Sequence, residues 1–220
     1  MGNPIKYNVH HFQPNPGYLT YDLNKDTMDF LWARIDKANE MDSAVNDRLA
    51  GNITKSLDMG LHDLGPIAEI VIPLCEEYVK QFSQPYHNQV AGECVNVLSF
   101  SDWWVNYQYQ NEFNPPHNHS GVYSWVIWMK IPTEFDDQKM LPIAEESTAK
   151  NHISNFAFSY VNTLGNINQL MIPMGKKVEG TLCLFPSQLK HSVNPFYNCD
   201  EPRISVAGNV SLYSKPPINK

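Results

Sequence analysis

The strongest constraint on the fold is a change of hydrophobic period near residue 94. Beyond this point, short runs of Val, Ile, Phe, Trp and Tyr alternate with polar residues, which is the two-residue period of a strand with one buried face. So many short strands indicate a β-sandwich or a barrel. The predicted strands are residues 95–100, 102–109, 123–131, 154–161, 168–173, 180–185 and 203–212.

Two amphipathic helices are expected upstream of these strands. The first spans residues 26–39, where apolar side chains recur every three or four positions. The second spans residues 67–82 and follows Pro66, a residue favoured in the first turn of a helix. Pro73 lies inside it and is expected to kink or break the helix. Both apolar stripes predict packing against a core.

The length of 220 residues is near the upper end of a single domain. We therefore expect one domain, with residues 1–90 forming an arm and helices that pack on a strand core at residues 91–214. Residues 133–151 form a long connection between two predicted strands, and loops of that size are often lids or binding loops.

Charge and hydropathy exclude some functions. The chain has 16 Lys and Arg against 23 Asp and Glu, a formal net charge of −7, so a nucleic-acid partner is not expected. No stretch approaches the roughly 20 apolar residues that cross a bilayer, and the N-terminal segment has no signal-peptide pattern. We expect a cytoplasmic protein without membrane contact. Oligomeric state stays open, with a homodimer through the N-terminal arm as one alternative.

Three histidines stand out by their positions. His117 and His119 are separated by one residue, between a Pro-Pro turn and an apolar strand. In an extended chain, residues i and i+2 point to the same side, about 7 Å apart, so both rings can reach one ion. Two such histidines are more often surface residues, and spacing alone leaves both alternatives open. His191 follows another apolar strand.

The last predicted strand has an unusual polar face. In RISVAGNVSL, Arg203 and Ser205 share one face, while Ile204 and Val206 lie on the other. A guanidinium and a hydroxyl two residues apart suit a carboxylate ligand. The alternative is an edge strand with one face in water.

Taken in order, H-x-H, a later lone His and R-x-S resemble the Fe(II)- and 2-oxoglutarate-dependent oxygenases. The segments WWVNYQYQNEFNPPHNHSGVYSWVIWMKIP, GTLCLFPSQLKHSVNPF and RISVAGNVSL are similar, more narrowly, to oxygenases of marine bacteria and their phages. The resemblance spans about residues 95–212. It implies a mainly β fold, a double-stranded β-helix (a cupin-like jelly roll), supported by N-terminal helices.

The resemblance also implies roles for single residues. His117 would be the first metal ligand and His191 the distal one. Arg203 would form a salt bridge to the far carboxylate of 2-oxoglutarate, and Ser205 would hydrogen-bond it. Tyr107 matches a hydroxyl that many members direct at the same cosubstrate, and its alternative is one more core aromatic. Two weaker candidates for the pocket wall are Asn106 and Trp128.

One departure from the family pattern concerns His119, which stands where the usual triad has Asp or Glu. It is a third neutral ligand, or it turns away and leaves water in its place, or the protein has lost turnover. The narrower group also carries H-x-H, which favours a metal site formed by His117, His119 and His191.

The implied activity is that of a dioxygenase with Fe(II), 2-oxoglutarate and O2 as cofactors. It would decarboxylate 2-oxoglutarate to succinate and hydroxylate a prime substrate that the sequence does not identify. The alternative function is a non-catalytic, cupin-like metal-binding module or a phage accessory protein, which the replacement at His119 keeps open.

Overall fold

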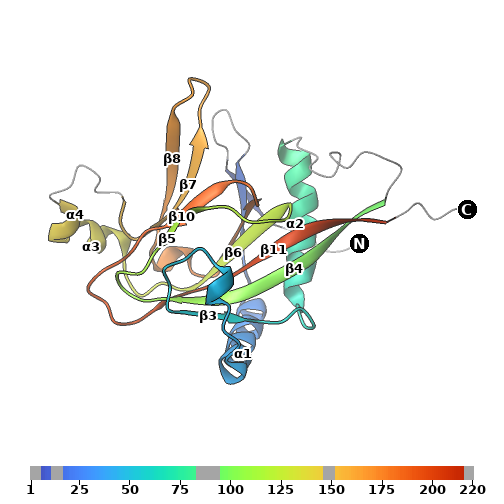
Figure 1. Ribbon diagram of the computed structural model, residues 1–220, viewed down its shortest axis with the longest axis horizontal. Helices are drawn as coiled ribbons and strands as arrows, with labels where there is room; N and C mark the ends of the chain where they lie inside the picture. The colour runs from blue at the N-terminus through green and yellow to red at the C-terminus, as the bar shows by residue number, and fades with distance from the viewer. Residues whose placement is uncertain (1–5, 11–16, 83–94, 146–151, 216–220) are drawn as a thin grey trace, which may run out of the picture.

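The structure is a computed structural model that describes residues 6–10, 17–82, 95–145 and 152–215 (Figure 1). It is mainly β, as predicted, and consists of two antiparallel sheets. The larger sheet has seven strands, in the order β1 (Asn8–His10), β2 (Tyr18–Asp22), β9 (Thr181–Pro186), β6 (Tyr123–Lys130), β11 (Arg203–Lys215), β4 (Val95–Gln108), β3 (Lys55–Asp58). The smaller sheet has the order β5 (Asn114–His117), β10 (Lys190–Val193), β7 (Asn155–Val161), β8 (Ile167–Pro173).

Two helices cover one face of the larger sheet. They are α1 (Lys25–Met41) and α2 (Pro66–Phe82), close to the predicted ranges. Asn24 caps α1 by accepting a hydrogen bond from the backbone of Thr27, at 2.9 Å. The helix α2 begins at Pro66 as expected and continues as one helix through Pro73. Helix residues such as Leu31 and Leu74 share a core with the near face of the sheet.

A second core lies between the two sheets. It contains Val126 and Trp128 from β6, Phe156 and Phe158 from β7, and Phe185 from β9. The molecule therefore has three layers, with helices, large sheet and small sheet in that order. The functional side chains lie in the space between the two sheets.

The strand predictions hold except where strands are short or lack alternation. The predicted strands 95–100 and 102–109 form one long strand, β4. The strands β5 and β10 were missed because each has only four residues, and β5 (NPPH) contains two prolines. Inside the long connection lie two short helices, α3 (Phe135–Lys139) and α4 (Pro142–Glu145).

The N-terminal region does more than pack on the strand core. Its strands β1 and β2 extend the large sheet at one edge through pairing of β2 with β9, and β3 pairs with β4 at the other edge. These strands were not predicted. The predicted boundary at residues 90 and 91 lies outside the described residues, as do parts of the N-terminal arm.

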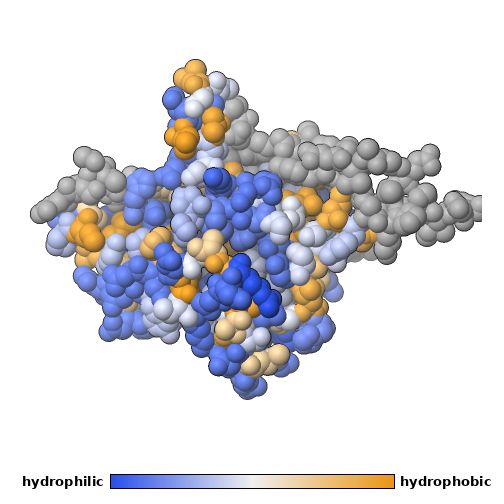
Figure 2. Space-filling view, viewed as in Figure 1, coloured by the Kyte–Doolittle hydropathy of each residue, from blue (hydrophilic) through white to orange (hydrophobic). Residues whose placement is uncertain are grey.

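The outer surface is largely hydrophilic on the face shown in Figure 2. An exception is the β7–β8 hairpin, which projects from the body and has apolar side chains at its tip (Figures 1 and 2), with Leu164 82% and Ile167 78% exposed. No described helix is both long enough and apolar enough to cross a membrane.

Candidate functional site

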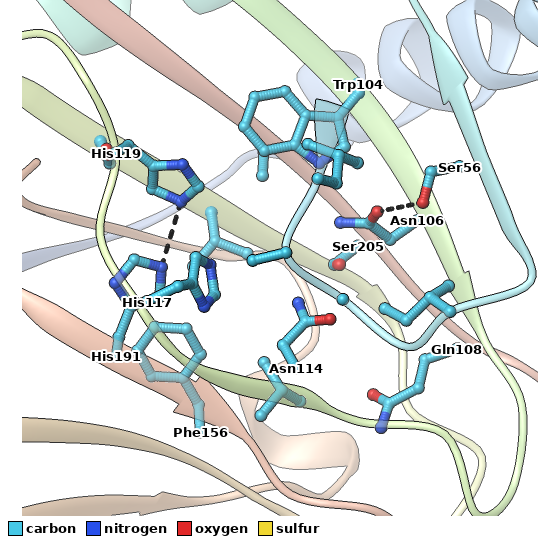
Figure 3. A pocket seen from close by; sticks show the side chains of 18 of the residues that line it. Ser56, Trp104, Asn106, Gln108, Asn114, His117, His119, Phe156, His191 and Ser205 are labelled. Carbon is cyan, nitrogen blue, oxygen red and sulfur yellow. Dashed lines mark hydrogen bonds between the residues drawn. The ribbon is translucent and has the colours of Figure 1, made fainter. Parts of the chain in front are cut away.

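The three predicted histidines meet at one end of the space between the sheets (Figure 3). His117 on β5 and His191 on β10 are direct partners in the antiparallel register, and His119 follows β5 by two residues. One ring nitrogen from each lies within 4.8 Å of the other two. The Nε2 atoms of His119 and His191 are 3.2 Å apart. The structure thus brings together residues that are 74 positions apart at most.

Backbone carbonyls orient two of these rings. The Nδ1 of His117 is 2.7 Å from the carbonyl oxygen of Pro115, and the Nδ1 of His191 is 3.0 Å from that of Leu189. A carbonyl only accepts hydrogen bonds, so each Nδ1 carries the proton. Each Nε2 then presents its lone pair, which is the arrangement found in metal-binding histidines.

Burial keeps the rings neutral. Loss of hydration, with a smaller contribution from the neighbouring His117, lowers the pKa of His119 to about 4. Burial also lowers the pKa of His117 and, well below its usual value, that of His191. The neutral imidazole is the form that binds a metal.

The geometry fits a shared divalent ion. Two nitrogens bound at right angles to one ion, each at about 2.1 Å, would lie about 3.0 Å apart, close to the 3.2 Å between His119 and His191. Imidazole nitrogen suits Fe(II) as well as other late divalent metals. Within the part of the chain that the structure describes, the cluster contains histidines only.

Aromatic side chains surround the histidines. Phe156 stacks on His191 with ring centroids 5.5 Å apart, and Phe185 contacts the same ring edge-on at 4.8 Å. Trp104 lies 5.7 Å from His119. These ring contacts restrict the orientation of the imidazoles.

Arg203 lines the same cavity as the histidines. It is only 3% exposed, yet none of the described carboxylates forms an ion pair with it. Its neutral partners are the side-chain oxygens of Gln108, at 3.1 Å, and Ser154, at 2.9 Å, and its Nε has no partner. The guanidinium also lies over the ring of Phe196, at 5.0 Å.

A buried cation without a counter-ion is costly, since desolvation of the charge is not offset. Burial lowers the pKa of Arg203 to about 9, so the side chain is still charged at neutral pH. The cavity therefore presents a positive charge at one position and three neutral nitrogen ligands at another. This arrangement suits a small anion that also reaches a metal.

The sequence comparison agrees with this chemistry. Residues 102–209, which include the three histidines and Arg203, match the model of a family described as "Putative 2OG-Fe(II) oxygenase". The chain belongs to the 2OG-Fe(II) oxygenase superfamily. That superfamily uses Fe(II), 2-oxoglutarate and O2, and the histidine cluster of this oxygenase has the donors to bind iron. No curated protein sequence matches the chain.

A solved structure supports the fold of the oxygenase. A prolyl-4-hydroxylase from Pseudomonas putida matches with a TM-score of 0.50 and 12% identity, over 87% of this chain and 90% of that chain. A prolyl hydroxylase from Trichoplax adhaerens, in complex with a hypoxia inducible factor peptide, gives 0.49 and 10%, over 90% and 82%. At 12% identity the likeness to the Pseudomonas structure concerns the fold alone, and the predicted jelly roll is confirmed. The narrower likeness to marine and phage proteins stays a prediction.

Ser205 and Trp128 line the cavity of this oxygenase, as does Asn106. Ser205 is on the same face of β11 as Arg203, as the alternation predicted, and pairs in register with Asn106 on one side and Trp128 on the other. Trp128 also belongs to the core between the sheets. Both interpretations of Trp128, wall and core, therefore hold.

Tyr107 does not reach the cavity. It lies on β4 between Asn106 and Gln108, which face the cavity, so its own side chain points to the opposite face, toward the helices. There its hydroxyl accepts a hydrogen bond from Asn39, at 2.6 Å, and the ammonium group of Lys55 lies 4.5 Å from its ring centre. The structure therefore separates Tyr107 from the other predicted site residues.

Several cavity residues were missed in the sequence. Gln108 shares the strand face of Asn106, so alternation alone would have predicted it. A further missed residue is Ser154, which is fully buried and bonds Arg203 from outside the cavity lining; it adopts a left-handed conformation, with φ of 45°, and has no sequence signal. Ser56 and Gly51 come from the N-terminal region, outside the family match.

Proposed function

We propose that this oxygenase couples the decarboxylation of 2-oxoglutarate to succinate with the hydroxylation of a second substrate, at iron held by His117, His119 and His191. The observation that carries the proposal is Arg203, a buried guanidinium that lacks a counter-ion and lines the same cavity as three neutral imidazoles. A dicarboxylic acid that bridges the two supplies the missing anion and a donor group for the metal.

Arg203 binds the far carboxylate of 2-oxoglutarate in this proposal. Charge-assisted hydrogen bonds from a guanidinium fork give both affinity and direction. Gln108 and Ser154 hold the guanidinium in place. Ser205, two residues further along β11, donates its hydroxyl to the same carboxylate. The positive charge of Arg203 is then neutralised by the ligand.

In this proposal the three histidines would hold the iron at a fixed position in the cavity. His117 and His191 bind through Nε2, because their Nδ1 atoms are committed to Pro115 and Leu189. Bound iron supplies the activation of O2 and the oxidising power that no side chain provides. The aromatic wall excludes bulk water from the reacting groups.

His119 is the third ligand in this proposal. The 3.2 Å separation from the Nε2 of His191 supports ligation over a ring that turns away. Three neutral imidazoles leave the site one negative charge short of the usual set of two histidines and a carboxylate. The metal should then be a stronger Lewis acid than in that set.

The prime substrate has room in an adjoining cavity. This second cavity has a volume of about 440 Å³ and shares Leu49, Trp104 and His119 with the first. Its lining also includes Asp58 and Asp102. A substrate held there lies beside His119 and thus next to the metal.

Succinate release tests the proposal. The protein is incubated with 2-oxoglutarate, Fe(II), ascorbate and O2, and succinate is compared between the wild type and Arg203→Ala. We expect uncoupled turnover in the wild type and its loss in the variant, while the exposed control Lys190→Ala behaves as wild type. If the wild type neither releases succinate nor binds 2-oxoglutarate, the non-catalytic metal-binding module is the better description.

A further inference from the structure

A hydrogen-bonded pair of side chains lies in the wall of the cavity. Ser56 on the edge strand β3 donates its hydroxyl to the Oδ1 of Asn106 on β4, at 2.7 Å (Figure 3). The two residues are direct partners in the antiparallel register. Ser56 is 1% exposed and Asn106 9% exposed. The pair is thus a buried polar contact in which each side chain satisfies the other, as buried polar groups generally require.

The other half of the Asn106 amide is free. With Oδ1 engaged by Ser56, the Nδ2 group points away from Ser56 into the cavity (Figure 3). None of the described residues accepts a hydrogen bond from Nδ2. This nitrogen is therefore an unpaired donor that is open to the cavity. A ligand in the cavity that carries an acceptor can bind to it.

The register places this donor between Arg203 and the histidines. Along β11 and β4, Arg203 pairs with Gln108, Ser205 with Asn106, and Ala207 with Trp104. Trp104 contacts the ring of His119. A ligand that extends from Arg203 to the metal therefore passes the row that Ser205 and Asn106 form.

We propose that Asn106 binds the cosubstrate, with Nδ2 donating to a carboxylate oxygen of 2-oxoglutarate, and that Ser56 is a positioning residue that fixes the amide with its nitrogen toward the ligand. This inference rests on the proposed function. It adds a contribution from β3, which lies before the family match at residues 102–209. The local backbone supports this role, because the amide N–H of Ser56 is itself bound by the side-chain oxygen of Asn46, at 3.1 Å.

Binding of 2-oxoglutarate to the Mn(II)-loaded protein, measured by calorimetry without O2, tests the inference apart from turnover. Asn106→Ala should weaken binding about tenfold or more, the range for a hydrogen bond to a charged group. Asn106→Asp should weaken it further, since the carboxylate still accepts from Ser56 but repels the anionic ligand. A purely structural role predicts the reverse order, with the isosteric Asp as the milder change.

Ser56→Ala is expected to weaken binding severalfold in the wild type and to have no further effect in Asn106→Ala. Such non-additivity indicates that Ser56 acts through Asn106. The matched control is Asn39→Ala, which removes an amide–hydroxyl contact on the opposite face of β4 and should leave the affinity unchanged.

The results of these titrations separate the inference from the proposed function. If the wild type binds 2-oxoglutarate and Arg203→Ala does not, but the Asn106 and Ser56 variants bind as wild type, this inference is wrong and the proposed function stands. Independent effects of Ser56→Ala in both backgrounds overturn the positioning role. If the wild type binds no 2-oxoglutarate, the proposed function fails and the inference with it.

Discussion

Two buried arginines lie in the two core regions of this oxygenase, and their surroundings differ. Arg34 on α1 faces the core beneath the helices, where it bonds the carbonyl of Met59, lies 3.6 Å from the carboxylate of Asp63 and stacks near Trp103. Arg203 faces the cavity between the sheets and has only neutral partners. The chain supplies a counter-ion for the first charge and none for the second. Charge balance at Arg203 is therefore left to a ligand.

Removing the charge of Arg203 should weaken the binding of 2-oxoglutarate without lowering the stability of the fold. This is the largest effect that we expect. Arg203→Met keeps the volume, so the free energy of unfolding of the ligand-free protein should stay constant or rise, because an uncompensated buried charge is lost. Binding of 2-oxoglutarate should weaken by about a hundredfold or more, the scale for a desolvated charge contact. Calorimetry and chemical denaturation measure the two quantities.

Arg34→Met gives the opposite pattern. It should lower the free energy of unfolding by about 1–2 kcal/mol, an amount reduced by the partial exposure of Asp63, and should leave the affinity for 2-oxoglutarate unchanged in the folded protein. If Arg203→Met unfolds the protein as readily as Arg34→Met does, Arg203 is a structural residue and the contrast disappears.

Substitution of the proposed metal ligands should give the next largest effect. His191→Ala should reduce the affinity for Mn(II) by at least about a hundredfold, since even residues that only support a ligand change it by about ten to a hundredfold. His119→Asp should retain binding, because it restores the usual carboxylate. His62, which is exposed, serves as control through His62→Ala. Tight binding by His191→Ala would contradict the three-histidine site.

Acidification should weaken metal binding only at a pH well below the usual pKa of histidine. Because burial lowers the pKa of His119 to about 4 and also lowers the pKa values of His117 and His191, protons compete with the metal only below the usual histidine range near about 6.5. The affinity should be flat down to about pH 6 and should fall as the pH approaches the lowered pKa values. A series of Mn(II) titrations at different pH checks this. A steep loss of affinity already above pH 6.5 would show that the rings are hydrated.

The sequence predicts different parts of the molecule unequally. Long alternating strands such as β6 and β11 are predictable, because each residue in them has a clear buried or exposed side. The strands that carry His117 and His191 have four residues each, too few for a period to show, and they are strands only because they pair with each other and with β7. The histidine cluster was predicted from the order of motifs instead.

Residues from the N-terminal region could not be predicted in the site at all. Ser56 reaches the cavity because β3 pairs with β4 across 50 residues of sequence, a long-range contact that no local pattern encodes. The position of Gly51 in the cavity lining is equally non-local, because its backbone packs against Asn114. A β-carbon on Gly51 would lie 2.0 Å from the side-chain oxygen of Asn114. Such close approach is a property of the packed structure.

A substitution at Tyr107 should give the smallest effect, and it tests which side chains of β4 face the cavity. The resemblance implied a cosubstrate contact, but a β-strand directs successive side chains to opposite faces, so Tyr107 cannot share the cavity with Asn106 and Gln108. Tyr107→Phe should therefore leave the affinity for 2-oxoglutarate unchanged and lower the free energy of unfolding by about 1 kcal/mol, through loss of the hydrogen bond from Asn39. Calorimetry and denaturation on the same samples measure both. A tenfold weaker binding without loss of stability would mean that β4 is shifted by one residue in solution, which would also remove Asn106 from the site.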